Sequence, residues 1–170
     1  MNKDLNIKFE KAVRLLTKHI PSSDVNSRKP ILFHSIRVGV YLYESGYAQD
    51  IVLAGVLHDA IEWSEITEQM LKEEFGDNIT KLVLASTKDD SIGDGKEKTD
   101  ELIRRCVENG QDALIVKTAD IIDSFKWYLG QKNEDELQYC AKNADAILKY
   151  KPENFNDKIF DDLKKIREKV

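Results

Sequence analysis

The chain has 170 residues, of which 41% are hydrophobic and 34% are charged, and its formal net charge is −5. This length predicts one domain that spans residues 1–170 and buries a substantial core. The acidic balance speaks against a broad nucleic-acid surface, but a local cationic pocket can still bind a small anionic ligand. The chain has no apolar run of 18 residues and a charged beginning. We therefore predict no membrane span, no secretion signal and a cytoplasmic protein.

Apolar residues recur at three- and four-residue steps, and Gly and Pro are few, which predicts an all-α protein of about eight or nine helices. The expected helices cover residues 3–20, 31–45, 48–63, 68–75, 77–86, 96–108, 112–125, 134–150 and 154–169. Residues 131–170 are expected to serve only as packing helices. The turn-rich segment 88–95 is either a mobile lid over a site or an ordinary surface connection.

The stretch from Val52 to Ser64 has an apolar helical pattern but carries three ionisable side chains, His58, Asp59 and Glu62. A spacing of four places His58 and Glu62 on one helix face, and Asp59 lies about 100° round from His58. Burial of an imidazole and two carboxylates among aliphatic side chains is costly unless something compensates them. A divalent metal ion provides such compensation, so this helix predicts one half of a metal site.

Two other predicted helices each turn a polar side chain inward. His34 lies in the buried stripe of the second helix, and Asp120 lies within an aliphatic run of the seventh. Together with His58 and Asp59 they form a mixed nitrogen and oxygen donor set that suits Mn²⁺, Fe²⁺ or Zn²⁺. Such an ion lowers the pKa of bound water and polarises a phosphoryl oxygen, and Glu62 is placed to orient that water or to move protons.

The order His34, His58, Asp59, Asp120 resembles the signature of the HD-domain metal-dependent phosphohydrolases. Within that superfamily the chain resembles the hydrolase domain of the RelA/SpoT type, and its length is similar to that of the small stand-alone members. The matching segments, in a core of about residues 5–130, are Lys29–Pro30, Phe33–Gly39, Ala54–Glu62, Glu74–Gly76 and Val116–Asp123. The resemblance implies a single-domain HD-type helical bundle around a metal site. It also implies Mn²⁺-dependent removal of the 3′-pyrophosphate of the alarmones ppGpp and pppGpp.

The resemblance further implies a role for each matching side chain. The expected metal ligands are His34, His58, Asp59 and Asp120. The expected catalytic residues, which act on the water nucleophile, are Glu62 and Asp59. The expected substrate-binding residues are Arg28, Lys29, Lys88, Lys117, Asp123 and Ser124. The cofactor expected first is Mn²⁺, with Fe²⁺, Zn²⁺ and Mg²⁺ as alternatives, and the expected partner is a small anionic nucleotide.

Three features depart from the pattern of the alarmone hydrolases. Trp63 replaces the second acidic residue of the family's HDxxED motif, Ser124 replaces an asparagine, and the arginine loop is shortened to Asn26–Pro30. Two other functions therefore stay open: an HD-type 5′-nucleotidase or other small-phosphoester hydrolase, and a catalytically weak nucleotide-sensing domain. The oligomeric state is not predicted, and a homodimer is one option.

Overall fold

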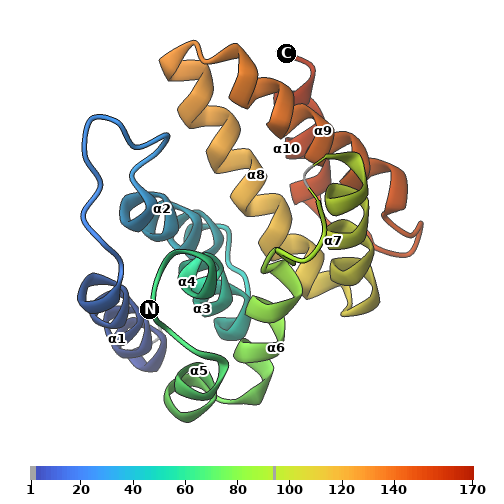
Figure 1. Cartoon of the computed structure of the whole chain (residues 1–170). Helices are drawn as coiled ribbons and strands as arrows, with labels where there is room; N and C mark the ends of the chain where they lie inside the picture. Colours follow the sequence, from blue (N-terminus) through green and yellow to red (C-terminus); the bar gives the residue numbers. More distant parts are fainter. Residues whose placement is uncertain (1–2, 94) are drawn as a thin grey trace.

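The computed structural model describes residues 3–93 and 95–170, and all regular secondary structure in that part of the chain is helical (Figure 1). Its helices are α1 (Lys3–His19), α2 (Ile31–Glu44), α3 (Gln49–Leu57), α4 (Ala60–Trp63), α5 (Glu68–Phe75), α6 (Asp77–Ser86), α7 (Lys96–Glu108), α8 (Gln111–Gln131), α9 (Glu134–Tyr150) and α10 (Lys158–Arg167). The predicted all-α class is confirmed, and these ten helices exceed the expected number because one predicted helix is divided in two.

Most helix boundaries agree with the prediction, and two differ for local reasons. α8 continues past residue 125 and through Gly130, and it ends at Lys132, which adopts the left-handed conformation. α10 begins later than predicted, because the side chain of Asp157 caps it by accepting a hydrogen bond from the backbone N–H of Ile159.

Helix α8 is the central element of the fold. It packs against α2, α3, α6, α7, α9 and α10. In Figure 1, α1, α2 and α5 lie on one side of it and α7, α9 and α10 lie on the other. Because α8 is enclosed in this way, its polar residues Lys117, Asp120 and Asp123 are buried. A buried polar side chain requires a partner, so the environment of α8 is where a functional site is expected.

Helices α2 and α3 approach each other closely because each presents a glycine at their contact. A Cβ atom at Gly39 would lie 2.2 Å from Cγ2 of Val56, and one at Gly55 would lie 2.3 Å from Cδ1 of Leu42. Both distances are far shorter than van der Waals contact, so any larger residue would have to push its neighbour away. The two glycines therefore let α2, which carries His34, pack directly against α3, which His58 follows.

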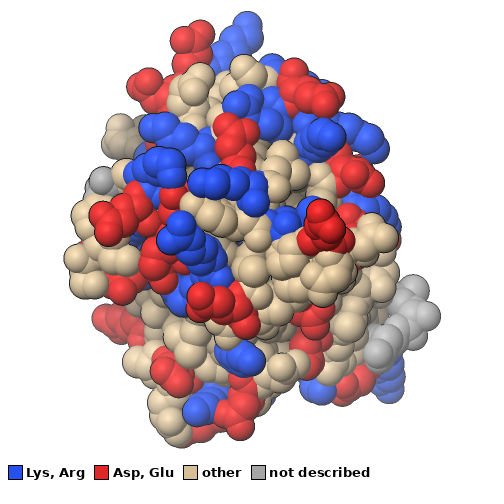
Figure 2. Space-filling model, turned by 90° about the vertical axis from the view of Figure 1, so that its right-hand side faces the viewer, with Lys and Arg blue, Asp and Glu red and all other residues tan. Residues whose placement is uncertain are grey.

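The surface over α7, α9 and α10 carries both signs of charge. Figure 2 shows this face, on which lysine and arginine side chains are interspersed with aspartate and glutamate. Ion pairs on these helices include Arg105–Glu101 at 2.8 Å and Arg167–Asp145 at 2.9 Å. Within residues 3–93 and 95–170, no helix combines the length and the apolar character needed to cross a membrane.

Candidate metal centre

The helix predicted over residues 48–63 is interrupted at its two central functional residues, so the prediction of one continuous helix was wrong. α3 ends at Leu57 and α4 begins at Ala60, and between them Asp59 has φ −96° and ψ 0°. A regular helix would hold two consecutive side chains about 100° apart. Both residues keep right-handed backbone angles, and Oδ1 of Asp59 lies 3.4 Å from Nε2 of His58, so both side chains contribute to one site.

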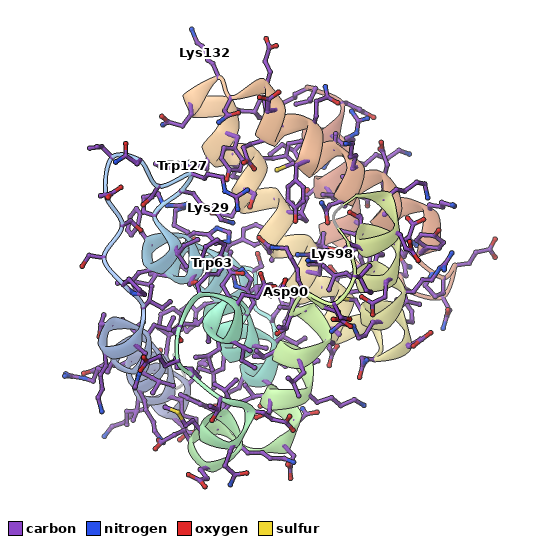
Figure 3. The ribbon with its side chains drawn as sticks, viewed as in Figure 1. Lys29, Trp63, Asp90, Lys98, Trp127 and Lys132 are labelled. Atoms are coloured by element: carbon purple, nitrogen blue, oxygen red, sulfur yellow. The ribbon has the colours of Figure 1, made fainter. Side chains whose placement is uncertain are left out.

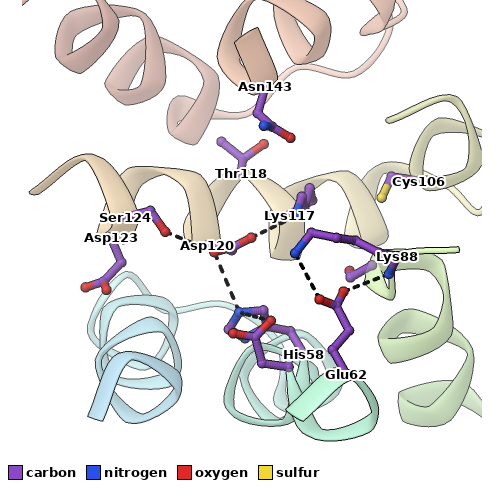
Figure 4. A network of polar contacts seen from close by, with 12 residues as sticks. His58, Glu62, Lys88, Cys106, Lys117, Thr118, Asp120, Asp123, Ser124 and Asn143 are labelled. Carbon is purple, nitrogen blue, oxygen red and sulfur yellow. Dashed lines mark hydrogen bonds and ion pairs between the residues drawn. The ribbon is translucent and has the colours of Figure 1, made fainter. Parts of the chain in front are cut away.

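Glu62, on the short helix α4, is directed at the segment that follows α6. Its Oε1 accepts a hydrogen bond from the backbone N–H of Lys88 at 2.7 Å, and its Oε2 accepts one from the Lys88 ammonium at 2.9 Å (Figure 4). Both oxygens of the predicted catalytic carboxylate are therefore bound by one residue. Of the turn-rich segment 88–95, residue 94 lies outside the described residues.

The two buried histidines present the same ring nitrogen to each other. Nδ1 of His58 lies 2.8 Å from the carbonyl oxygen of Gly55, and Nδ1 of His34 lies 2.6 Å from Oδ2 of Asp123. An oxygen acceptor at Nδ1 places the proton of a neutral imidazole there, so the lone pair lies on Nε2. The two Nε2 atoms are 3.2 Å apart, and in the neutral tautomers their lone pairs would face each other, an arrangement that a proton or a metal ion between them relieves.

Two carboxylates complete the cluster. Oδ1 of Asp120 lies 3.1 Å from Nε2 of His34 and 3.7 Å from Nε2 of His58, and Oδ2 of Asp59 lies 3.7 Å from Nε2 of His34. The donor atoms of His34, His58 and Asp120 all lie within 4.8 Å of one another. Imidazole nitrogens and carboxylate oxygens in so compact a set fit a divalent metal ion. The structure thus brings all four predicted ligands together.

The electrostatics of the centre favour ionised carboxylates and a positive charge on His58. Burial by itself would lower the pKa of His58, but the carboxylates of Asp59 and Asp120 outweigh it and raise the pKa to about 10. Burial would likewise raise the pKa of Asp59, yet His58 and Lys29 lower it far below its usual range. The pKa of Asp120 is also lowered against burial, chiefly by Lys117 and Lys29. Both carboxylates are therefore ionised at neutral pH.

Two lysine side chains supply positive charge inside the centre, and Figure 4 shows one of them, Lys117, beside Asp120. The Lys117 ammonium lies 2.8 Å from Oδ2 of Asp120, and the residue is only 3% exposed. The Lys29 ammonium lies 2.8 Å from Nε2 of His34, 3.0 Å from Oγ of Ser124 and 3.6 Å from Oδ1 of Asp120. The hydroxyl of Ser124 also donates to Oδ1 of Asp120, at 3.3 Å. Three of the predicted substrate-binding residues thus contact the metal-ligand cluster itself.

Asp123 lies behind His34, where it is held by an arginine. Its Oδ2 accepts hydrogen bonds from Nδ1 of His34 at 2.6 Å and from Arg37 at 2.7 Å, and its Oδ1 accepts from Nε of Arg37 at 2.9 Å. The guanidinium of Arg37 lies over the rings of Phe33 and Trp127, 5.0 and 5.5 Å from their centroids. No role for Arg37 was predicted, although its spacing of three residues from His34 was a usable signal.

Arg28 and Trp63 lie toward the surface. The Arg28 side chain is 65% exposed and pairs with Glu136 at 3.1 Å, and its backbone carbonyl accepts a hydrogen bond from the indole of Trp127 at 3.2 Å. Trp63 is 40% exposed at the end of α4. In the view of Figure 3, Lys29 lies between Trp127 and Trp63. The loop before α2 is therefore attached to α8 through Trp127, with the Arg28 side chain turned outward.

The family of the chain follows from a match over most of its length. The model of the HD domain family matches residues 12–147, a range that includes all four predicted metal ligands. The chain belongs to the HD domain family, and the resemblance described from the sequence is confirmed. This membership and the cluster of His34, His58 and Asp120 together imply a divalent metal ion.

Curated relatives share this domain within much longer proteins. The chain is 33% identical over 142 residues to the probable guanosine-3′,5′-bis(diphosphate) 3′-pyrophosphohydrolase of Mycoplasma pneumoniae, a match that covers 73% of this chain and 19% of that protein. It is 28% identical over 113 residues to the guanosine-3′,5′-bis(diphosphate) 3′-pyrophosphohydrolase of Aquifex aeolicus, covering 64% of this chain and 16% of that protein. The chain thus spans less than a fifth of the length of these relatives.

Two solved structures share the fold over nearly the whole chain. One is a metazoan ortholog of SpoT described as hydrolyzing ppGpp, with a TM-score of 0.75 and 19% identity over 95% of this chain and 94% of that one. The other is lmo0812 from Listeria monocytogenes EGD-e, with a TM-score of 0.65 and 20% identity over 87% of this chain and 98% of that one. At these identities the likeness confirms the HD-type helical fold.

Proposed function

We propose that the protein is a metal-dependent phosphohydrolase that removes the 3′-pyrophosphate of ppGpp or pppGpp. The observation that carries this proposal is the pair of Nε2 atoms of His34 and His58, 3.2 Å apart, with Oδ1 of Asp120 3.1 Å from the first. Support also comes from the curated relatives, which are named as 3′-pyrophosphohydrolases of guanosine 3′,5′-bis(diphosphate). The proposed substrate is thus a small anionic nucleotide. We also propose a cytoplasmic location for the protein.

The metal, on this proposal, is held by His34, His58, Asp59 and Asp120. Mn²⁺ is the first candidate, with Fe²⁺, Zn²⁺ and Mg²⁺ as alternatives, because two imidazoles and two carboxylates suit a borderline ion with open positions. When bound, such an ion supplies a water of lowered pKa and a Lewis acid for a phosphoryl oxygen.

The charged side chains around the ligands supply the remaining chemistry. Water attacks the phosphorus bonded to the 3′ oxygen, and that P–O bond breaks to release pyrophosphate. Glu62 takes the proton that the water loses and returns it to the leaving 3′ oxygen, which becomes a hydroxyl. Lys29 and Lys88 neutralise the charge of the pyrophosphate group. The Lys88 ammonium lies 2.9 Å from Oε2 of Glu62. When this ammonium pairs with a phosphate oxygen of the substrate instead, Oε2 is free to act as a base.

Three further residues support this chemistry. Lys117 keeps Asp120 ionised through an ion pair of 2.8 Å. Ser124 contacts Lys29 and Asp120, which places it at the border between ligand cluster and substrate. The exposed guanidinium of Arg28 is available to the base or a phosphate of the nucleotide.

A nucleotide-sensing domain is a second candidate function, because both oxygens of Glu62 are bound by Lys88. If that contact stays closed, no carboxylate takes the proton of the water. Trp63 stands next to Glu62 in the chain, and an indole, which only donates, cannot replace a carboxylate. A hydrolase of another small phosphoester, such as a 5′-nucleotidase, would keep the centre and change only the substrate.

The test is metal-dependent turnover by the purified chain loaded with Mn²⁺. Release of pyrophosphate from ppGpp and of phosphate from dGMP and p-nitrophenyl phosphate is measured for the wild type, His58→Ala and Asp59→Ala. The matched control is His19→Ala, which removes the same side chain from the end of α1. We expect pyrophosphate release from ppGpp that both site variants abolish and the control retains.

The other results assign the alternatives. Phosphate release from dGMP or p-nitrophenyl phosphate alone would replace the alarmone by a smaller phosphoester. Binding of Mn²⁺ and ppGpp without any turnover would favour the sensor. A wild-type chain that binds no Mn²⁺ would overturn the proposed centre itself.

A further inference from the structure

We propose that Asp123 and Arg37 form a positioning pair for His34, which sets how this histidine binds a metal ion. The inference rests on the proposed metal centre and assigns Asp123 a task other than the substrate binding predicted from the sequence. Neither residue is one of the four proposed ligands, and both act through the imidazole of His34.

The contact between Asp123 and His34 is short and shielded from water. Oδ2 of Asp123 lies 2.6 Å from Nδ1 of His34, and the histidine is fully buried. A carboxylate that accepts the Nδ1 proton fixes the tautomer and the ring orientation, and makes Nε2 a more basic ligand. At His58 the corresponding acceptor is only the neutral carbonyl of Gly55. The two histidines are therefore unequal ligands, and His34 is the one strengthened by a charge.

Arg37 fixes the orientation of the carboxylate. It donates to Oδ1 from Nε at 2.9 Å and to Oδ2 from its terminal nitrogen at 2.7 Å, a bidentate arrangement that prevents rotation of Asp123. The guanidinium is itself held between the rings of Phe33 and Trp127. Its positive charge also offsets a carboxylate in a centre that already contains Asp59 and Asp120.

These contacts favour a positioning task for Asp123 over direct contact with the substrate. Each of its oxygens accepts at least one hydrogen bond from Arg37 or His34. A carboxylate would also repel the phosphates of an anionic nucleotide. The contacts around Arg37 also include the loop before α2, because the indole N–H of Trp127 donates to the carbonyl of Arg28 at 3.2 Å. The aromatic ring that stacks on Arg37 thus also attaches the loop that carries Arg28 and Lys29.

The test measures metal binding directly, in the full chain and without substrate. Mn²⁺ dissociation constants are determined from the electron paramagnetic resonance of the free ion, and Co²⁺ complexes are compared by visible absorption. The variants are Asp123→Asn, Arg37→Met and Arg37→Lys. The matched control is Asp145→Asn, which removes the carboxylate of another bidentate pair, Arg167–Asp145, on α9 and α10.

We expect Asp123→Asn to weaken Mn²⁺ binding by about 10- to 100-fold, the range found when outer partners of metal-bound histidines are removed. The Co²⁺ absorption should change in the same variant, because the ring of His34 is no longer held at one angle. Arg37→Met should weaken binding less, and Arg37→Lys should recover part of that loss by keeping the charge. Asp145→Asn should match the wild type in both measurements.

Several results would overturn the inference. Wild-type Mn²⁺ affinity and Co²⁺ absorption in Asp123→Asn would do so, and so would an equal loss in Asp145→Asn. If Asp123→Asn fails to fold by circular dichroism, the Arg37 variants decide, and wild-type affinity in Arg37→Met counts against the pair. A wild type that binds no Mn²⁺ refutes the proposed centre instead, so the two failures are distinguishable.

Discussion

Two arginine–aspartate pairs in the molecule have the same bidentate geometry but occupy different environments. Arg37 and Asp123 join α2 to α8 next to the metal centre, with distances of 2.9 and 2.7 Å. Arg167 and Asp145 join α10 to α9 with distances of 2.9 and 3.1 Å. The carboxylate side chain is 11% exposed in the first pair and 58% exposed in the second. Burial, and not geometry, is what separates them.

The difference shows how a buried charge acquires a function. Water can solvate Asp145 whether or not Arg167 is present, so that pair contributes about 0–1 kcal/mol to stability. Burial would raise the pKa of Asp123, yet its contacts with His34 and Arg37 lower it, so the partners keep this carboxylate charged. A buried carboxylate that must be paired holds its partners in place, and here one partner is a proposed metal ligand.

The largest loss is expected where a buried carboxylate loses its partner completely. Lys117→Met keeps most of the side-chain volume but removes the ammonium 2.8 Å from Asp120. We expect a loss of about 3–5 kcal/mol in the free energy of unfolding, because the charge of Asp120 is then insufficiently compensated. Urea unfolding in the presence of a chelator measures it, with Arg167→Met as the matched control. A loss below about 1 kcal/mol would show that the buried ion pairs resemble the exposed ones.

An intermediate effect is expected from pH. The pKa of His58 is raised from 6.5 to about 10, so the stabilisation by its proton is complete below pH 6.5 and is lost as pH rises to about 10. A metal ion that binds Nε2 must displace this proton. Mn²⁺ affinity should therefore rise by about tenfold per pH unit within this window, while stability in chelator falls. Mn²⁺ titrations between about pH 6.5 and about 8.5 measure the slope, and a flat profile would contradict it.

The smallest effect is expected at the exposed pair. Arg167→Met should change the free energy of unfolding by about 1 kcal/mol or less, because water replaces the lost contact with Asp145. Urea unfolding at low and at high salt measures the change in the free energy of unfolding and how far salt screens the ion pair. A loss similar to that of Lys117→Met would remove the distinction between the two environments.

Most helices and the four donor residues could be predicted from the sequence because their signals are local. The apolar periodicity of α2 and α8 defines an inward face, and His34 and Asp120 occupy that face in place of aliphatic residues. Caps such as Thr67 and Gly76 likewise define the ends of α5 over a few residues. In each case a residue and its immediate neighbours contain the information.

The rest depended on contacts between distant parts of the chain. Arg37 and Asp123 are 86 residues apart, so no local pattern connects them. The ion pair of Glu62 with Lys88 depends on how the segment after α6 approaches α4. The interruption after Leu57 could not be predicted, because the apolar pattern continues through it and only the packing of the centre shows the turn.

We expect that interruption to let α4 open separately from the rest of the fold. One helical turn such as α4 does not persist alone, because nucleation of a helix is unfavourable. It is held at one end by Asp59 in the ligand cluster and at the other by Glu62 on Lys88. We expect opening of this turn to remove a proposed ligand and a proposed base together, without unfolding α3 or α8. Hydrogen exchange of the amides of residues 60–63 would therefore report the occupancy of the centre, while the amides of α8 report the stability of the whole molecule.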